Sequence, residues 1–480
     1  MSLLYDNEFI YIARQLGDVD DPEMSIYITH SRRNSSDCDE KVITHMINSF
    51  QESQKTKEQR PVSKRFSQTP LKLTIPEIIQ KVNDGSMLLK CLRAPLAKTN
   101  LGLGDIQKTG EGADLMLKIN YKRHSDGTLE VVNEALLKKQ KKVLGYLLKQ
   151  FGSALLSGRS VMTISLPVTI FEKQSLLERT ASNFLLAPHF LEKGAKANSP
   201  LDQFKYTLAF FIASLHHGIN PEKPFNPILG ETFQGLIDGC PIYLEQVSHH
   251  PPMCAYQMLG RGYEISGLTE FAADISTNSV KSKKMGYPVI KFNKFNTKII
   301  AEYPAGIMSG TTFGKRTFYL TGKLYLLDEK NRYYAEIEFD LDSGSIFKKR
   351  KTPKDHFEGG IYEVKQKFVD KFIAQTIKNR EIDIRFKEKE HAITKLEEVE
   401  GNWMEYLNIG GQTYWTIGNP WPYHLHYFDN PLPSDSNYRK DILQLRAGNE
   451  DKAQEAKLEL EELQRRDRKL REQGKHKGRK

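Results

Sequence analysis

The chain has 480 residues, of which 39% are hydrophobic and 10% are aromatic. This content is enough for a sizeable core and excludes a disordered chain, and the length allows two or three domains. The formal net charge is +10, but residues 465–480 alone hold nine Lys or Arg against two acidic residues. The remainder is therefore close to neutral. A basic tail of this kind suits an anionic membrane or nucleic acid, although most such tails are simply solvated chain ends.

The cysteines and the hydropathy indicate a soluble protein of a reducing compartment. Four cysteines, at positions 38, 91, 240 and 254, show no framework spacing, which fits the cytosol. The longest apolar run, 206–215, is far shorter than the roughly 18 residues that span a bilayer. Charged residues interrupt the first stretch, so no signal peptide is expected. The cysteines that flank a histidine pair lack metal-ligand spacing, and we expect neither a metal nor another cofactor.

The first 138 residues are expected to form two parts. Residues 1–70 contain strand-like segments at 8–13 and 25–28 and an amphipathic pattern at 40–50, followed by a polar linker. This order fits the end of a small β-domain of the pleckstrin-homology kind. Residues 71–138 form a poorly defined extension, in which a proline followed by an acid marks one helix start.

An amphipathic helix is expected over residues 139–160. Its hydrophobic residues recur at helical spacing, and they are Val143, Leu144, Leu147, Leu148, Phe151, Leu155 and Leu156. The ordinary interpretation is a helix that packs against the core. However, the glycines at 145 and 152 each cost about 1 kcal/mol of helix stability. A helix weakened in this way can open or insert shallowly into loosely packed lipid.

The segments that follow predict a mainly antiparallel α+β fold. We expect a strand over 164–169 and helices over 175–190 and 200–216, and then strand-like segments with turns recur to about residue 390. Residues 319–326 and 333–339 read as a hairpin. Many strands in series without alternating helices favour an antiparallel sheet that curls into a barrel. A barrel of more than about eight strands has room for a ligand.

Residues 245–252 are Glu-Gln-Val-Ser-His-His-Pro-Pro. The preceding residues, 240–244, read as a strand. Proline fixes φ and lacks an N–H, so the strand must stop or bulge after the two histidines. We therefore expect His249 and His250 to present two imidazoles at the rim of the sheet. Paired histidines are, by themselves, more often structural than functional.

This octapeptide resembles the signature of the oxysterol-binding protein-related lipid-transfer family. Two further segments are similar to that family and occur in its order: Lys-Pro-Phe-Asn-Pro-Ile-Leu-Gly-Glu-Thr at 223–232, and the helical segment 457–465. The resemblance covers roughly the last two thirds of the chain. It implies a large incomplete β-barrel that encloses a lipid tunnel, with an N-terminal lid helix, helices before the barrel and a C-terminal helical subdomain.

The resemblance also implies domain boundaries. The lipid-binding domain is expected to cover residues 139–480. Within it, the lid would cover about 139–160, the barrel about 161–400 and the C-terminal subdomain about 401–480.

The resemblance implies that the three segments meet at the tunnel mouth and bind the head group of phosphatidylinositol 4-phosphate. The residues carried over are Lys223, Phe225, Asn226, His249, His250, Lys457, Glu461 and Arg465. Cations and imidazolium suit phosphates, and amide and carboxylate groups suit hydroxyls. Phe225 stands where the family more often has leucine. The three charged residues of the last helix are spaced i, i+4 and i+8 and form one stripe, which alone is also typical of a solvated salt-bridge ladder.

The resulting hypothesis is a cytosolic lipid-transfer protein, and not an enzyme, with no catalytic residue. It would exchange phosphatidylinositol 4-phosphate for a sterol or another lipid, and it would contact anionic membranes peripherally, for example at endoplasmic reticulum contact sites. One alternative is a phosphoinositide sensor or scaffold without net transport. Another is a lipid hydrolase that uses His250 as a base. Nucleic-acid binding is disfavoured, because no aromatic residues are interleaved with the charges of the tail.

Overall fold

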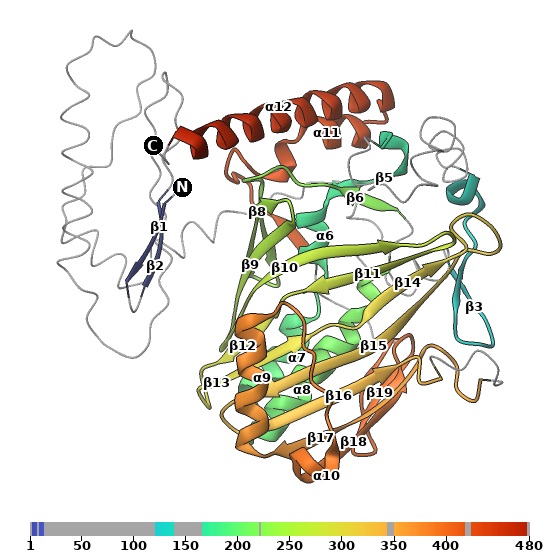
Figure 1. The fold of residues 1–480 in the computed structure, drawn as a ribbon, viewed down its shortest axis with the longest axis vertical. Coiled ribbons are helices and arrows are strands. Elements are labelled where there is room, and N and C mark those ends of the chain that lie inside the picture. Colours follow the sequence, from blue (N-terminus) through green and yellow to red (C-terminus); the bar gives the residue numbers. More distant parts are fainter. Residues whose placement is uncertain are drawn as a thin grey trace. The chain divides into compact units, whose positions relative to one another are not determined.

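The computed structural model describes residues 2–6, 9–13, 121–138, 166–219, 222–342, 350–417 and 424–477. The chain divides into two compact units, Met1–Pro95 and Leu96–Lys480 (Figure 1). The described part of the first unit is an antiparallel hairpin of β1 (Ser2–Asp6) and β2 (Phe9–Ala13). This confirms the strand expected at 8–13. The strand expected at 25–28, the helix at 40–50 and the lid helix at 139–160 lie outside the described residues.

The second unit is built on an antiparallel barrel (Figure 1). The predicted α+β fold with a large, mainly antiparallel barrel is therefore confirmed. The strands are β3 (Tyr121–Arg123), β4 (Leu129–Val131), β7 (Thr232–Ile237), β8 (Cys240–His249), β9 (Pro252–Gly260), β10 (Tyr263–Ile275), β11 (Ser279–Met285), β12 (Val289–Phe292), β13 (Thr297–Glu302), β14 (Ala305–Ser309), β15 (Thr317–Asp328), β16 (Tyr333–Phe339), β17 (His356–Val364), β18 (Ala392–Asn402), β19 (Tyr406–Ile409), β20 (Gln412–Thr416) and β21 (Leu425–Tyr427).

Two long strands each pair with two partners along one edge. Strand β10 pairs with β12 near its start and with β11 near its end, and β15 pairs with β14 and then β13. The predicted hairpin of β15 and β16 is present, and its register pairs Leu324 with Ile337. Its turn is fixed by Asp328, whose Oδ1 accepts hydrogen bonds from the backbone N–H groups of Lys330 and Asn331 at 3.0 and 3.1 Å.

The sheet extends beyond the range 161–400 that was expected for the barrel. Strand β4 pairs with β15, β19 and β20 continue from β18, and β21 pairs with β7. The expected boundaries at 138 and 400 therefore separate strands that belong to one sheet. Strands β3, β4 and β21 have three residues each, which is too short for an alternating pattern to be recognised.

Three helices pack against one face of the sheet: α6 (Leu176–Ser182), α7 (Ala187–Lys196) and α8 (Pro200–Ser214). Ser199 caps α8, because its Oγ accepts a hydrogen bond from the Asp202 N–H at 3.1 Å. A fourth helix, α9 (Gln366–Lys378), packs on the opposite face (Figure 1). Leu326 and Leu327 show the alternation, since the first joins the core that contains α6–α8 and the second joins the α9 cluster. The helices α6–α8 thus lie inside the barrel and α9 lies outside it.

Two local predictions were wrong. The strand expected over 164–169 is not formed in its described part, because Val168–Ile170 is a 3-10 helix, η2, that follows Pro167. The strand comes next, as β5 (Phe171–Ser175). The single helix expected over 175–190 is two helices, α6 and α7, and a turn at 183–186 separates them. The helix expected over 200–216 is confirmed as α8 followed by the 3-10 helix η3 (Leu215–Gly218).

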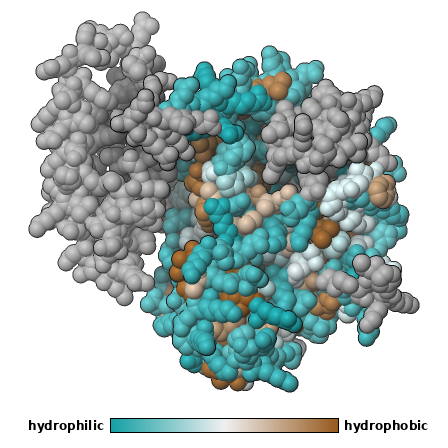
Figure 2. All heavy atoms as spheres, viewed as in Figure 1, coloured by the Kyte–Doolittle hydropathy of each residue, from teal (hydrophilic) through white to brown (hydrophobic). Residues whose placement is uncertain are grey.

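The C-terminal helices form a third layer across one end of the barrel. Helices α11 (Lys440–Arg446) and α12 (Glu450–Lys477) lie near β5 and β6 (Lys223–Phe225) (Figure 1). Ile442, Leu445 and Ala453 pack with Phe171 and Phe225 in one cluster. The face drawn in Figure 2 is mainly hydrophilic, with smaller hydrophobic patches. Among the described residues, no helix is both long and apolar enough to cross a membrane.

Candidate functional site

The segment 223–232 is anchored on a pair of stacked phenyl rings. Strand β6 pairs in parallel with β5, in a register that places Lys223 beside Phe171 and Phe225 beside Ser175. The rings of Phe171 and Phe225 are 4.7 Å apart, centroid to centroid, and Phe225 is 1% exposed. Phe225 is therefore buried and supports the Phe171 ring.

Two lysines converge on this support from different elements. The Lys223 Nζ of β6 is 5.3 Å from the centroid of the Phe171 ring, and the Lys457 Nζ of α12 is 5.7 Å from the same centroid. Lys223 donates a hydrogen bond to the side-chain oxygen of Asn226, and Lys457 donates one to Glu461. Four of the predicted residues are thus arranged around one aromatic face.

Burial and a neighbouring like charge make it costly for Lys223 to carry its positive charge. The pKa of Lys223 is lowered to about 8, first by burial and then by the charge of Lys457, while the carboxylate of Glu172 opposes the shift. An ammonium that is costly to charge gains the most from an incoming anion, because the anion replaces lost hydration and offsets the like charge. The pair is therefore poised to bind a phosphate or another oxyanion.

The charged stripe of α12 runs from a buried end to an exposed end. The side chains of Lys457, Glu461 and Arg465 are 6%, 27% and 64% exposed. Arg465 Nη2 donates to Glu461 Oε2 at 3.3 Å. The ladder that the spacing predicted is present, but its first member is buried and faces the aromatic pair. A purely solvated ladder would not bury Lys457.

The histidine pair lies at the end of β8, as expected. The rings of His249 and His250 are 4.5 Å apart. The pKa of His249 is lowered by burial and by the positive charges of His250, Arg468 and Arg471, whereas a hydrogen bond with the Pro227 backbone opposes this. The segment 223–232 and α12 therefore both contribute to the electrostatic environment of His249. Arg468 and Arg471 were not predicted, although they continue the basic side of the same helix.

A buried ion-pair network, also missed by sequence reasoning, fixes the loop after Asn226. The guanidinium of Arg439 donates to the carbonyl of Asn226 at 2.7 Å, to Glu231 Oε2 at 2.9 Å and to Asp441 Oδ2 at 2.6 Å. Glu231 also accepts hydrogen bonds from the Ile228 N–H at 2.9 Å and from the Ser175 hydroxyl. The sequence offered one signal for this network, because Glu231 lies within the segment 223–232 that resembles the family.

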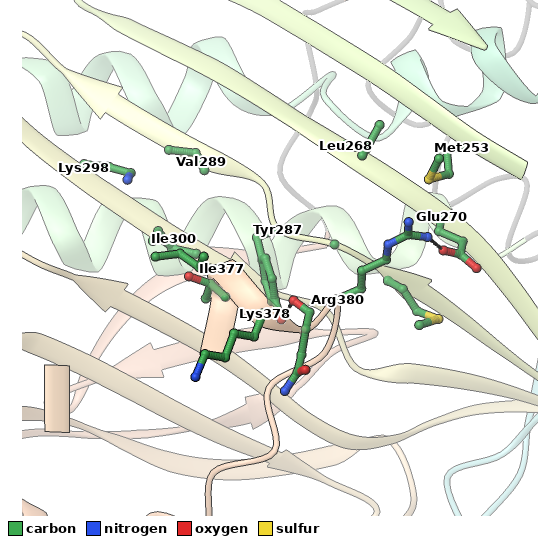
Figure 3. Close-up of a pocket in the computed structure, with 14 residues that line it drawn as sticks. Met253, Leu268, Glu270, Tyr287, Val289, Lys298, Ile300, Ile377, Lys378 and Arg380 are labelled. Carbon is green, nitrogen blue, oxygen red and sulfur yellow. Dashed lines mark hydrogen bonds and ion pairs between the residues drawn. The ribbon is translucent and has the colours of Figure 1, made fainter. Parts of the chain in front are cut away.

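A separate pocket lies on the outer face of the barrel (Figure 3). It has a volume of about 390 Å³ and lies where β10 changes partner from β12 to β11, beside the end of α9. The Tyr287 hydroxyl donates to the carbonyl of Asn379 at 3.0 Å, and Arg380 pairs with Glu270 at its edge. Its apolar lining is Met253, Leu268, Met285, Val289, Ile300 and Ile377. None of the residues predicted from sequence lines it.

Comparisons with known proteins agree with this architecture. Residues 153–479 match the family model described as oxysterol-binding protein. Oxysterol-binding protein 9 of Dictyostelium discoideum is 32% identical over 371 residues, which are 75% of this chain and 83% of that protein. Oxysterol-binding protein homolog 6 of Saccharomyces cerevisiae is 30% identical over 245 residues, 47% of this chain and 54% of that protein.

Two solved structures resemble the fold. The Osh3 ORD of Saccharomyces cerevisiae in complex with PI(4)P has a TM-score of 0.52 and 24% identity, covering 69% of this chain and 84% of that one. The Osh1 ORD domain in complex with cholesterol has a TM-score of 0.50 and 19% identity, covering 70% and 89%. Because a family model matches most of the chain and a relative matches over most of its own length, this chain belongs to the oxysterol-binding protein family of lipid-binding proteins.

Proposed function

We propose that this protein binds phosphatidylinositol 4-phosphate at the rim of its barrel and exchanges it for a second lipid, such as a sterol, between membranes. The observation that carries the proposal is the convergence of Lys223 and Lys457 on the Phe171 ring. The pKa of His249 responds to the backbone of Pro227 in the same loop and to Arg468 and Arg471 of α12. Together these groups suit a phosphorylated polyol, since cations bind phosphates while Asn226 and Glu461 bind hydroxyls.

The barrel would supply the affinity that the rim does not. Each acyl CH₂ removed from water contributes about 0.8 kcal/mol, so shielding two acyl chains offsets the cost of extracting the lipid. The rim would then supply the specificity for the head group. Support comes from the solved relative that holds PI(4)P and from the one that holds cholesterol. The protein would bind peripherally to anionic intracellular membranes, including those at endoplasmic reticulum contact sites. It would leave the lipid chemically unchanged.

Extraction and transfer of labelled phosphatidylinositol 4-phosphate between liposomes test the proposal. The double variant His249→Ala with His250→Ala is expected to lose extraction, while its circular dichroism spectrum stays unchanged. His426→Ala, which removes an exposed imidazole from β21, is the matched control and should extract at the unmutated rate. Extraction by the double variant at the unmutated rate would overturn the site.

The state of the lipid after the assay separates the alternatives. Transfer returns intact lipid to the acceptor liposomes, whereas a hydrolase returns a cleaved product. A sensor or scaffold would bind liposomes that contain the phosphoinositide but deliver none to the acceptor. Intact lipid in the acceptor is the expected result, and either of the other two results would contradict lipid exchange.

A further inference from the structure

A second group of basic side chains lies inside the barrel. It consists of Arg179 of α6, His217 of η3 and Lys284 of β11, and we refer to it as the interior cluster. Side chains of a strand alternate between its faces. Lys283 pairs with Glu381, which follows the outer helix α9, at 2.8 Å. Lys284 therefore points to the opposite side, into the barrel.

Aromatic contacts place the ammonium of Lys284 between the wall and the inner helices. Its Nζ is 4.9 Å from the centroid of the Tyr303 ring. The Tyr303 ring in turn lies 5.3 Å from Phe211 of α8. Lys284 and Tyr303 are only half-buried. Their remaining accessible surface thus faces the space between the sheet and the helices, where a cargo would lie.

Arg179 is held in place on the helical side of this space. Its Nη2 donates to the carbonyls of His217 and Ile219 at 3.0 and 3.2 Å. The charge of Arg179 lowers the pKa of Lys284, after the larger effect of burial, to about 8. Burial lowers the pKa of His217 most, and His216, Arg179 and, more weakly, Lys284 lower it further. The three groups therefore share one electrostatic neighbourhood.

The positive charge of the interior cluster has little compensation. Among the described residues, no carboxylate forms an ion pair with Lys284, and the carboxylate that interacts with Arg179 is Glu172. Burial raises the pKa of Glu172 to about 7 even though Arg179 opposes it, so this carboxylate is only partly charged at neutral pH.

A neutral cargo would leave this charge unbalanced. A partly desolvated ammonium that pairs with no carboxylate among the described residues carries a desolvation cost that an apolar ring system or a single hydroxyl does not relieve. An oxyanion would relieve it, because charge-assisted hydrogen bonds to Lys and Arg are the stronger kind. The Tyr121 hydroxyl is also buried and makes no hydrogen bond to a described residue, and Arg179 acts on its pKa. It adds a donor for the same ligand.

We propose that Arg179 and Lys284 form a second oxyanion site inside the barrel, which binds the anionic group of an acyl lipid. The oxyanion is either the carboxylate of a fatty acid or the phosphate of a glycerophospholipid. The inference rests on the proposed function, since it assigns part of the cargo space of a lipid-transfer protein. It differs from the rim site, which takes the phosphoinositol.

Binding of a fluorescent polyene fatty acid and of its methyl ester to the full chain tests the site. Lys284→Met is expected to weaken binding of the acid by at least about tenfold, the loss of one charge-assisted hydrogen bond, and to leave the ester unchanged. Lys284→Arg keeps the charge and should retain the preference for the acid. Lys281→Met, on the exposed side of the same strand, is the matched control.

A second set of measurements identifies the source of the oxyanion. If the ligand is a glycerophospholipid, Lys284→Met should lower extraction of phosphatidic acid rather than binding of the fatty acid, with diacylglycerol binding unchanged. A selective loss of either anionic lipid supports the site. Equal losses for anionic and neutral lipids, or no loss for both anions, would overturn it. Failure of the proposed function looks different, since the unmutated chain would then extract no phosphatidylinositol 4-phosphate.

Discussion

The ammonium groups of Lys223 and Lys457 lie over one phenyl ring, at 5.3 and 5.7 Å from its centroid. One lysine comes from a three-residue strand and the other from the long C-terminal helix. Like charges near the same ring repel, so the packing of α11 and α12 on Phe171 and Phe225 holds them together at a cost. An anion bound between them recovers that cost. The fold is thus prepared for a ligand that it does not itself contain.

Removing one of these charges should weaken lipid binding while leaving the stability of the fold nearly unchanged. Lys457→Ala is expected to lower extraction of phosphatidylinositol 4-phosphate by about tenfold or more, since a charge-assisted contact is lost. The free energy of unfolding of the lipid-free protein should change little, because the repulsion from Lys223 disappears together with the bond to Glu461. Liposome extraction and urea denaturation measure the two effects. Lys452→Ala, on an exposed part of the same helix, should behave as the unmutated chain.

The depressed pKa of Lys223 predicts how stability and binding depend on pH. The unfolded lysine holds its proton up to about pH 10.5, whereas the folded one releases it near pH 8. The unfolded state therefore binds more protons between these values, and stability of the lipid-free protein should rise with pH across this window. Lys284 has a similarly lowered pKa of about 8 and contributes in the same direction.

Phosphoinositide extraction should show the opposite trend, because only the protonated lysine attracts a phosphate. It should fall as pH rises above about 8. Denaturation midpoints and extraction measured from pH 7 to 10 check both trends, and Lys223→Met should flatten both. Parallel curves for Lys223→Met and the unmutated chain would contradict the assignment of the titration to Lys223.

The buried pair of Arg439 and Glu231 should be important for stability. Arg439 is 8% exposed, and Arg439→Met leaves Glu231 and Asp441 without their cation. Breaking a buried pair from one side costs about 3 to 5 kcal/mol, so we expect a loss of this order in the free energy of unfolding. Chemical denaturation measures it. Arg261→Ala, which removes an exposed pair with Glu192 and Asp238, should cost less than about 1 kcal/mol.

Phe225 is a departure from the commoner leucine, and its substitution tests its role as a support. Phe225→Leu removes the stacking on Phe171, and with it about 1 kcal/mol of stability. The cationic groups above the ring stay in place, so extraction of phosphatidylinositol 4-phosphate should remain within about twofold of the unmutated rate. A loss of extraction without a loss of stability would show that the ring touches the ligand itself.

The parts of the fold that sequence reasoning found have a strong local pattern. The hairpin of β15 and β16 alternates and has a polar turn, so its register follows from its residues. The helix α8 has Ser199 and Pro200 at its start and a continuous apolar face. The strand expected over 164–169 failed because Pro167 is followed by a 3-10 turn that a hydrogen bond from Val168 to Gln454 of α12 holds. That contact lies far along the chain and leaves no local pattern.

The same reasoning explains which site residues could be predicted. Lys223, His249 and Lys457 lie in segments that resemble a known family. Arg439 lies outside these segments, and its role depends on its distance to Glu231, which composition and periodicity do not encode. The role of the interior cluster likewise depends on distances that composition and periodicity do not encode. Lys284 is one of three lysines within 281–284, and only its contact with Tyr303 distinguishes it from its solvated neighbours.

The bond from Arg439 to the carbonyl of Asn226 also has a consequence for synthesis of the protein. The loop that carries Lys223 emerges from the ribosome before the groups that close it and complete its charge, Arg439 and Lys457. A nascent chain can therefore form most of the barrel while its rim is still unfinished. On the proposed function, capture of a phosphoinositide would become available only after Arg439 and Lys457 have been translated, so a shorter nascent chain would not withdraw this lipid from the membranes around it.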